Sequence, residues 1–171
     1  MQGVEVHSVK LPLIVMNGAN VAFCYSQTFN SNQHVLEPNV CGIRVACDYF
    51  LHHALRVLVV LPSVWSRHRR ETLWKGHESF LDDLQSSGRL VTAPPTDDDD
   101  AYALLIAQRE NARAVARQHG PAFVLSNDQF RDAQERDTTG QLQNWLKDGS
   151  AVECGPGRIS FAFGDLGHLD D

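Results

Sequence analysis

The chain has 171 residues and a hydrophobic fraction of 43%, which fits one globular domain with a substantial core. No apolar run approaches the ~18 residues that a membrane-spanning helix needs, and the first ten residues lack the apolar stretch of a signal peptide. The formal net charge of −6 argues against a protein that simply coats nucleic acid, although it is compatible with acids gathered around a metal. The cysteines show neither a C-x-x-C pair nor finger-like spacing with histidine, so we expect a reduced, intracellular protein of the cytoplasm or nucleus.

Hydrophobic patterning predicts an alternation of strands and helices. In chain order the predicted elements are strand 11–16, helix 40–54, strand 56–62, helix 77–88, strand 89–94, helix 100–118, strand 122–128 and helix 141–146. The first strand ends in a polar turn, Asn-Gly-Ala-Asn, and a polar loop over 25–39 follows. The alternating segment 158–163 is predicted as an edge strand or a hairpin arm. This order is typical of an α/β domain with a parallel sheet covered on both faces.

One domain is expected over residues 11–165. Residues 1–10 are then an N-terminal extension, and residues 166–171 form a short acidic tail.

Polar and acidic side chains follow three of the predicted strands. Asn17 and Asn20 follow the first strand, the run Asp97 to Asp100 follows the third, and Asp128 and Asp132 follow the fourth. Because the carboxyl ends of parallel strands meet at one edge of a sheet, these groups should converge. Converging carboxylates repel each other unless a cation lies between them, and Mg²⁺ and Mn²⁺ prefer such oxygen ligands. This chemistry suits hydrolysis of a phosphodiester.

Each acidic group also has a purely structural interpretation. Aspartates at a helix start cap free backbone N–H groups and complement the helix dipole, and one residue of the aspartate run would suffice for that. Asp128 and Asp132 can be explained as turn and helix-start residues. The structural interpretation is favoured for each residue alone, and the metal site is favoured for the three groups together.

Five motifs in order connect the chain to a known family. They are "NGAN" at 17–20, "GIRVACDYF" at 42–50, "LPSVW" at 61–65, the pair Asp99 and Asp100 at a helix start, and "SNDQFRD" at 126–132. The resemblance covers roughly residues 11–163, and the last motif is the most specific. On these residues the chain resembles the Regnase-type NYN domains, which are PIN-like endoribonucleases that usually occur in proteins with a CCCH zinc finger.

The resemblance implies a PIN-like three-layer α/β sandwich, Mg²⁺ or alternatively Mn²⁺ as cofactor, and cleavage of single-stranded or stem-loop RNA by metal-activated water. The residues at the family's acidic positions are Asn17, Asp99, Asp100 and Asp128. Of these, Asn17, Asp100 and Asp128 would hold the metal. Asn20 matches a supporting asparagine, and Asp132 matches the acid that follows the arginine. A homodimer is a further implication, because PIN-like domains often self-associate.

Two departures from the family pattern concern activity. Asn17 stands where the family has aspartate, and a neutral carboxamide binds Mg²⁺ more weakly and cannot act as a base. The loop before the paired acids is "APPTDD", where family members tend to carry basic residues. We therefore expect an impaired or inactive nuclease, and the alternative is a non-catalytic RNA-binding or scaffolding domain. A phosphotransfer domain is disfavoured, because it would need an aspartate after the first strand or a lysine near 150–165.

The segment "SVWSRHRRETLWK" interleaves aromatic and basic residues. Its candidates for RNA contact are Arg67, Arg69, Arg70 and Lys75, because basic side chains hold phosphates. Trp65 and Trp74 can stack on bases, but packing in the core is favoured for both. Arg44 and Arg131 are weaker candidates.

Overall fold

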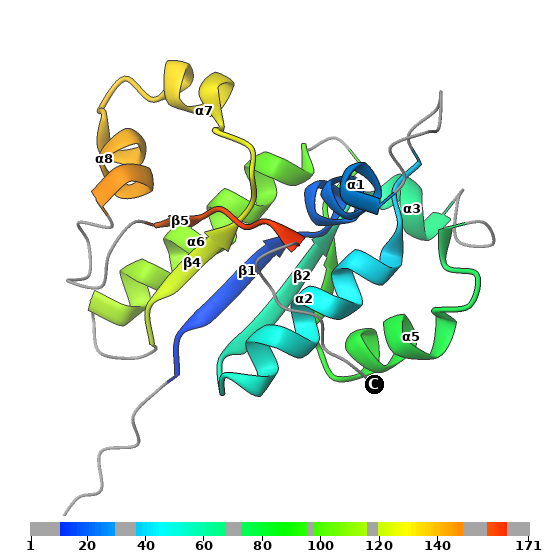
Figure 1. Ribbon diagram of the computed structural model, residues 1–171. Coiled ribbons are helices and arrows are strands. Elements are labelled where there is room, and N and C mark those ends of the chain that lie inside the picture. The colour runs from blue at the N-terminus through cyan, green and yellow to red at the C-terminus, as the bar shows by residue number, and fades with distance from the viewer. Residues whose placement is uncertain are drawn as a thin grey trace, which may run out of the picture.

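The centre of the molecule is a parallel β-sheet (Figure 1). The computed structural model describes residues 11–29, 37–67, 73–95, 98–115, 120–148 and 157–163. In these ranges the sheet has five strands, in the order β3-β2-β1-β4-β5, and every pairing is parallel. The strands are β1 (Leu13–Asn17), β2 (Arg56–Leu61), β3 (Leu90–Thr92), β4 (Ala122–Leu125) and β5 (Arg158–Ile159). The α/β class is confirmed. Strand β5 pairs in parallel with β4 at the edge of the sheet. The prediction of an edge strand over 158–163 is therefore confirmed, and the alternative of a hairpin arm is wrong.

Helices cover both faces of this sheet (Figure 1). They are α1 (Gly18–Phe29), α2 (Val40–His52), α3 (Ser63–Arg67), α5 (Glu78–Ser86), α6 (Asp99–Val115), α7 (Arg131–Arg136) and α8 (Gln141–Asp148). Helices α1, α2 and α5 pack on one face, whereas α6 crosses the other face and α8 adds to its core. Among the described helices, none combines the length and apolarity that a membrane crossing requires.

Alternate residues of β1 face opposite layers. Ile14 and Met16 join the core under α1 and α2, whereas Leu13 and Val15 join the core under α6. Side chains alternate across any strand, so a sheet covered on both faces needs apolar residues at every position. This explains the continuous apolar runs in the sequence.

Strand β1 continues directly into helix α1. Asn17 is the last strand residue and Gly18 the first helical one, so the predicted Asn-Gly-Ala-Asn turn is wrong. Helix α1 also takes the first part of the predicted loop over 25–39. Its exposed polar residues, such as Gln27, conceal the helical pattern in the sequence. A Cβ atom at Gly18 would lie 2.9 Å from the carbonyl oxygen of Val60, so glycine here permits close packing of α1 on β2.

The strand order places a topological switch point between β1 and β4. From β1 the chain moves outward through β2 and β3, and then returns across the sheet to β4 on the other side. Ligands of open parallel sheets bind beyond the carboxyl ends of the strands at such a point. Asn17 and Ser126, at the ends of these two strands, flank it.

Candidate active site

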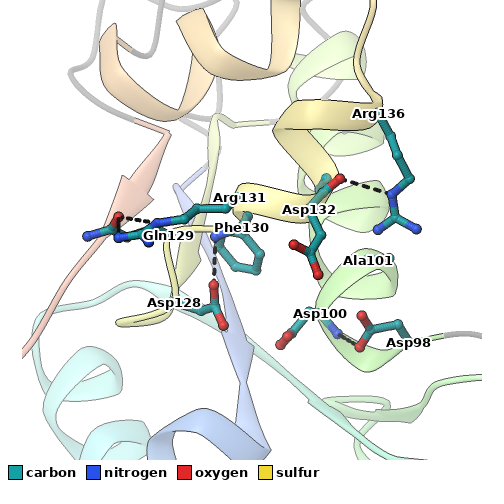
Figure 2. A pocket seen from close by; sticks show the side chains of 10 residues that line it. Asp98, Asp100, Ala101, Asp128, Gln129, Phe130, Arg131, Asp132 and Arg136 are labelled. Carbon is teal, nitrogen blue, oxygen red and sulfur yellow. Dashed lines mark hydrogen bonds between the residues drawn. The ribbon is translucent and has the colours of Figure 1, made fainter.

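A hollow of about 400 Å³ lies beside the switch point, and we call it the acidic hollow (Figure 2). Three structural elements supply its charged side chains: the start of α6, the loop after β4, and α7. The charged residues that line it are Asp98, Asp100, Asp128, Asp132, Arg131 and Arg136. The structure thus brings the acids after the third and fourth predicted strands to one place.

The start of α6 gathers three carboxylates. Asp98 precedes the helix, and its Oδ1 accepts a hydrogen bond from the backbone N–H of Asp100 at 3.1 Å, as an N-cap does. Asp98, Asp99 and Asp100 each place an oxygen within 4.8 Å of the others. One aspartate of the run therefore has the predicted capping role, and the close spacing of the three suits a hard cation.

Burial, together with repulsion between neighbouring carboxylates, shifts two pKa values at this helix start. Burial raises the pKa of Asp100 to about 6, and repulsion from Asp99, Asp98 and Asp128 adds to the shift, while a hydrogen bond from Asn17 opposes it. Burial also raises the pKa of Asp99, and repulsion from Asp98 contributes to that increase. A cation bound here would relieve this repulsion.

Asn17 contacts Asp100 of the acidic hollow and is only 1% exposed. Its Oδ1 accepts the backbone N–H of Asn20 at 3.2 Å in the first turn of α1, and its Nδ2 donates to Oδ1 of Asp100. A reversed carboxamide would place its oxygen against the Asp100 carboxylate and its NH₂ against the N–H of Asn20. The hydrogen bond at the helix start therefore orients the Asn17 side chain so that its NH₂ group faces Asp100. Its single oxygen faces the backbone of α1 and not the acids.

The turn after β4 directs the side chains of Asp128 and Arg131 to different sides. Asp128 accepts the backbone N–H of Phe130 at 2.6 Å, and Phe130 adopts a left-handed conformation with φ 52°. This backbone is uncommon for a bulky residue, and it is held by a ring that is only 4% exposed in the core under α6. As a result Asp128 faces the acidic hollow, whereas Arg131 points away from the carboxylates beside Gln129 (Figure 2).

Asn20 connects α1 to the loop after β4. Its Oδ1 accepts the backbone N–H of Asn127 at 2.9 Å. Asn127 in turn makes two hydrogen bonds to the backbone of Phe161, at 2.8 Å and 2.9 Å. These bonds join the segments after β1, β4 and β5, so both asparagines hold the edge of the sheet at which the acids lie.

The predicted RNA contacts are mostly outside the acidic hollow. Arg44 pairs with Asp48 at 4.0 Å, and Lys75 is exposed but does not line the hollow. The side chain of Arg67, together with Arg69 and Arg70, lies outside the described residues.

The two tryptophans of the basic segment are core residues. Trp65 is 4% exposed and Trp74 is 1% exposed, so neither ring presents a face to a base. The favoured interpretation of both is confirmed.

Among the lining residues of the acidic hollow, sequence reasoning missed Arg136, and it placed Asp98 only in the aspartate run and not among the named site residues. Arg136 follows Asp132 by one helical turn, and its Nε donates to the backbone carbonyl of Asp132 at 3.0 Å. The spacing of four residues in a helix is the signal that relates them. Asn17 and Asp99, which the sequence placed in the site, lie next to Asp100 but do not line the hollow.

The fold and the acidic edge correspond to a known domain family. Residues 10–147 match the family model described as the Zc3h12a-like Ribonuclease NYN domain, which is most of the chain. The chain belongs to this family. The resemblance to Regnase-type NYN domains is thereby confirmed, and the parallel sheet with helices on both faces agrees with a PIN-like NYN fold. No curated protein matches the chain.

The NYN family match includes every charged residue of the acidic hollow. It spans β1 to β4 together with α6 and α7, and it ends within α8. The edge strand β5 lies beyond the matched range.

Proposed function

We propose that this NYN domain is a metal-dependent endoribonuclease domain in a form whose cleavage of single-stranded or stem-loop RNA is strongly impaired by Asn17. The family is one of ribonuclease domains, which makes RNA the substrate. The observation that carries the proposal is the contact between the buried Asn17 amide and Asp100, which lines the acidic hollow.

The carboxylates that line the acidic hollow, together with the adjacent Asp99, fit a hard divalent cation. The carboxylates of Asp98, Asp99 and Asp100 lie close together, and that of Asp128 faces the same hollow. Oxygen donors of this kind suit Mg²⁺, or alternatively Mn²⁺. When bound, such an ion would polarise a phosphate and make a bound water more acidic.

The contacts of Asn17 support the proposal that cleavage is impaired. An aspartate at position 17 could accept the N–H of Asn20 with one oxygen and present the second oxygen to a cation beside Asp100. Asn17 presents an N–H donor in that direction instead, because its only oxygen is used at the helix start. The Asn17 amide thus donates a hydrogen bond to Asp100 at the position where an oxygen ligand to the metal would be needed.

The other residues of the hollow have roles that follow from their positions. The carboxylate of Asp132 extends toward that of Asp100 and would orient a water or accept its proton (Figure 2). Arg136 lies at the rim on the same helix and would contact non-bridging phosphate oxygens as negative charge increases on them.

The test is cleavage of a labelled single-stranded RNA with Mg²⁺ by the Asn17 chain and by Asn17→Asp. We expect the Asn17 chain to cleave slowly or not at all, and Asn17→Asp to cleave at least about 100-fold faster, since loss of one charge-stabilising group typically costs that much. EDTA should abolish the activity of Asn17→Asp.

Two controls separate this restored activity from contamination. Asp128→Asn in the Asn17→Asp background should be inactive, whereas Arg109→Gln, an exposed change on α6 away from the hollow, should cleave normally. No cleavage by Asn17→Asp, with RNA still bound, would support the alternative of a non-catalytic RNA-binding or scaffolding module. Self-association stays a prediction that sedimentation analysis of the chain would check.

A further inference from the structure

A second hollow, of about 480 Å³, adjoins the acidic hollow across Gln129 and Arg131, which line both. We call it the basic hollow. Its main polar residues come from α7, α8, β5 and the loop before α7, and they are Gln129, Arg131, Gln134, Gln143, Lys147 and Arg158. No carboxylate is among the described residues that line it.

Three elements that are separate in the sequence bring the cations together. Arg131 begins α7, Lys147 lies in the last turn of α8, and Arg158 lies in β5. This arrangement comes from packing of α7, α8 and β5 and not from the solvated face of one helix. Arg131 donates twice to Oε1 of Gln129, at 3.1 Å and 2.9 Å, and Arg158 donates to the carbonyl of Ser126 at 3.2 Å.

The cations of the basic hollow form no ion pairs within the described part of the chain. None of Arg131, Lys147 and Arg158 forms an ion pair there, whereas Arg56 and Arg113 both pair with Glu110 at the opposite edge of the sheet. Cations gathered without counter-charges attract a mobile anion. Guanidinium groups bind phosphate oxygens well, and glutamine amides offer both donors and acceptors to a nucleobase.

We propose that the basic hollow binds a backbone phosphate and its nucleotide in single-stranded RNA, adjacent to the phosphodiester held in the acidic hollow. Two observations point to RNA as the occupant: the charge complements phosphate, and the hollow is continuous with the candidate active site through Arg131. The volume is within the range of ordinary ligand sites, and an unstacked nucleotide can enter a concave site where a base-paired one cannot. The position of this subsite rests on the proposed function of the acidic hollow.

The test is binding of a fluorescent oligouridylate to the full chain in EDTA, measured by anisotropy over a range of salt concentrations. Lys147→Gln is the main variant, because Lys147 is exposed and we expect the fold to tolerate its replacement, which circular dichroism would check. We expect it to weaken binding about fivefold or more and to reduce the salt slope by roughly 0.7, as for one lost phosphate contact on a single strand. Arg158→Gln should act similarly, with circular dichroism confirming its fold.

The matched control is Arg109→Gln, which removes the same charge from an exposed position that lines neither hollow. It should bind RNA like the parent chain. Nuclear magnetic resonance gives the location: the side-chain amide signal of Gln143 should shift on addition of the oligouridylate, whereas that of exposed Gln108 on α6 should not.

The outcomes separate this proposal from the nuclease proposal. Binding in EDTA requires no cleavage, so an inactive Asn17→Asp variant would leave the subsite standing. Unchanged affinity in Lys147→Gln and Arg158→Gln, with the parent still binding RNA, would overturn the subsite alone. An equal loss in Arg109→Gln would also overturn it, because binding would then follow total charge. No binding by the parent chain in EDTA would overturn the subsite, whereas the nuclease proposal would still be decided by cleavage with Mg²⁺.

Discussion

At the scale of single residues, Asn17 and Asp100 determine the electrostatics of the acidic hollow. The Asn17 amide donates to Asp100 and so favours its charged form, but burial and the neighbouring aspartates outweigh this contact. The pKa of Asp100 therefore stays near 6, well above the ordinary value for aspartate. Above that pH the hollow holds a carboxylate that costs folding free energy, which is common in sites shaped for a ligand.

The raised pKa gives stability a definite pH dependence. The folded chain holds a proton on Asp100 that the unfolded chain has lost between about pH 4 and pH 6, so this group destabilises the fold as pH rises through that window. We expect Asp100→Asn to be more stable than the parent at pH 7 by about 1 kcal/mol after allowance for solvent screening, because asparagine still accepts from Asn17. The difference should vanish near pH 4, measured by urea unfolding in EDTA.

Asp137 provides a control, because its pKa is shifted in the opposite direction to that of Asp100. Hydrogen bonds from the hydroxyl of Thr139 and the backbone N–H groups of Leu142 and Thr139 lower the pKa of Asp137. Its contribution is present above the unfolded value and is lost as pH falls, so Asp137→Asn should be less stable than the parent at pH 7. If Asp100→Asn behaved like Asp137→Asn, the electrostatic description of the hollow would be wrong.

At the scale of elements, the junction of β1 and α1 positions Asn17. Asn17 ends a central strand and caps the helix that follows, so its side chain has little freedom. Gly18 keeps the helix close to β2, since a Cβ atom there would lie 2.5 Å from Cδ2 of Leu61 and 2.9 Å from the carbonyl oxygen of Val60. The site therefore depends on tight packing at this junction.

Gly18→Ala sets two effects against each other. Helix propensity alone would make alanine more favourable by up to ~1 kcal/mol, whereas the contacts with Leu61 and Val60 should cost about 1–3 kcal/mol. We expect a net loss of stability in urea unfolding. In a Leu61→Ala background the cost of Gly18→Ala should shrink, because one of the two close contacts is then removed. A stabilised Gly18→Ala would show that the packing is loose.

At the scale of the whole molecule, the sequence predicted the parallel α/β fold because strands buried on both faces leave continuous apolar runs. The placement of Asn17, Asp100 and Asp128 at one edge followed from topology alone. The hydrogen bond from Asn17 to Asp100 could not be predicted, since it joins residues 83 positions apart through rotamers set by packing. Nor could the direction of Arg131, which depends on the left-handed backbone of Phe130.

The folded chain places two hollows of different charge side by side, near the carboxyl ends of the strands at the topological switch point. Carboxylates from α6, α7 and the loop after β4 line one hollow, and cations from α7, α8 and β5 line the other. A metal and the RNA backbone would then be bound by separate groups. Our central claim is that Asn17 weakens metal binding in the acidic hollow, while the fold that supports this site is retained.

Direct binding of Mn²⁺, followed by electron paramagnetic resonance of the free ion, tests this claim most directly. We expect Asn17→Asp to bind Mn²⁺ at least about tenfold more tightly than the Asn17 chain, because the change adds a charged oxygen ligand beside Asp100 and removes the competing amide donor. Asp128→Asn in the same background should weaken that binding. Equal affinity of the Asn17 chain and the Asn17→Asp variant for Mn²⁺ would contradict the claim.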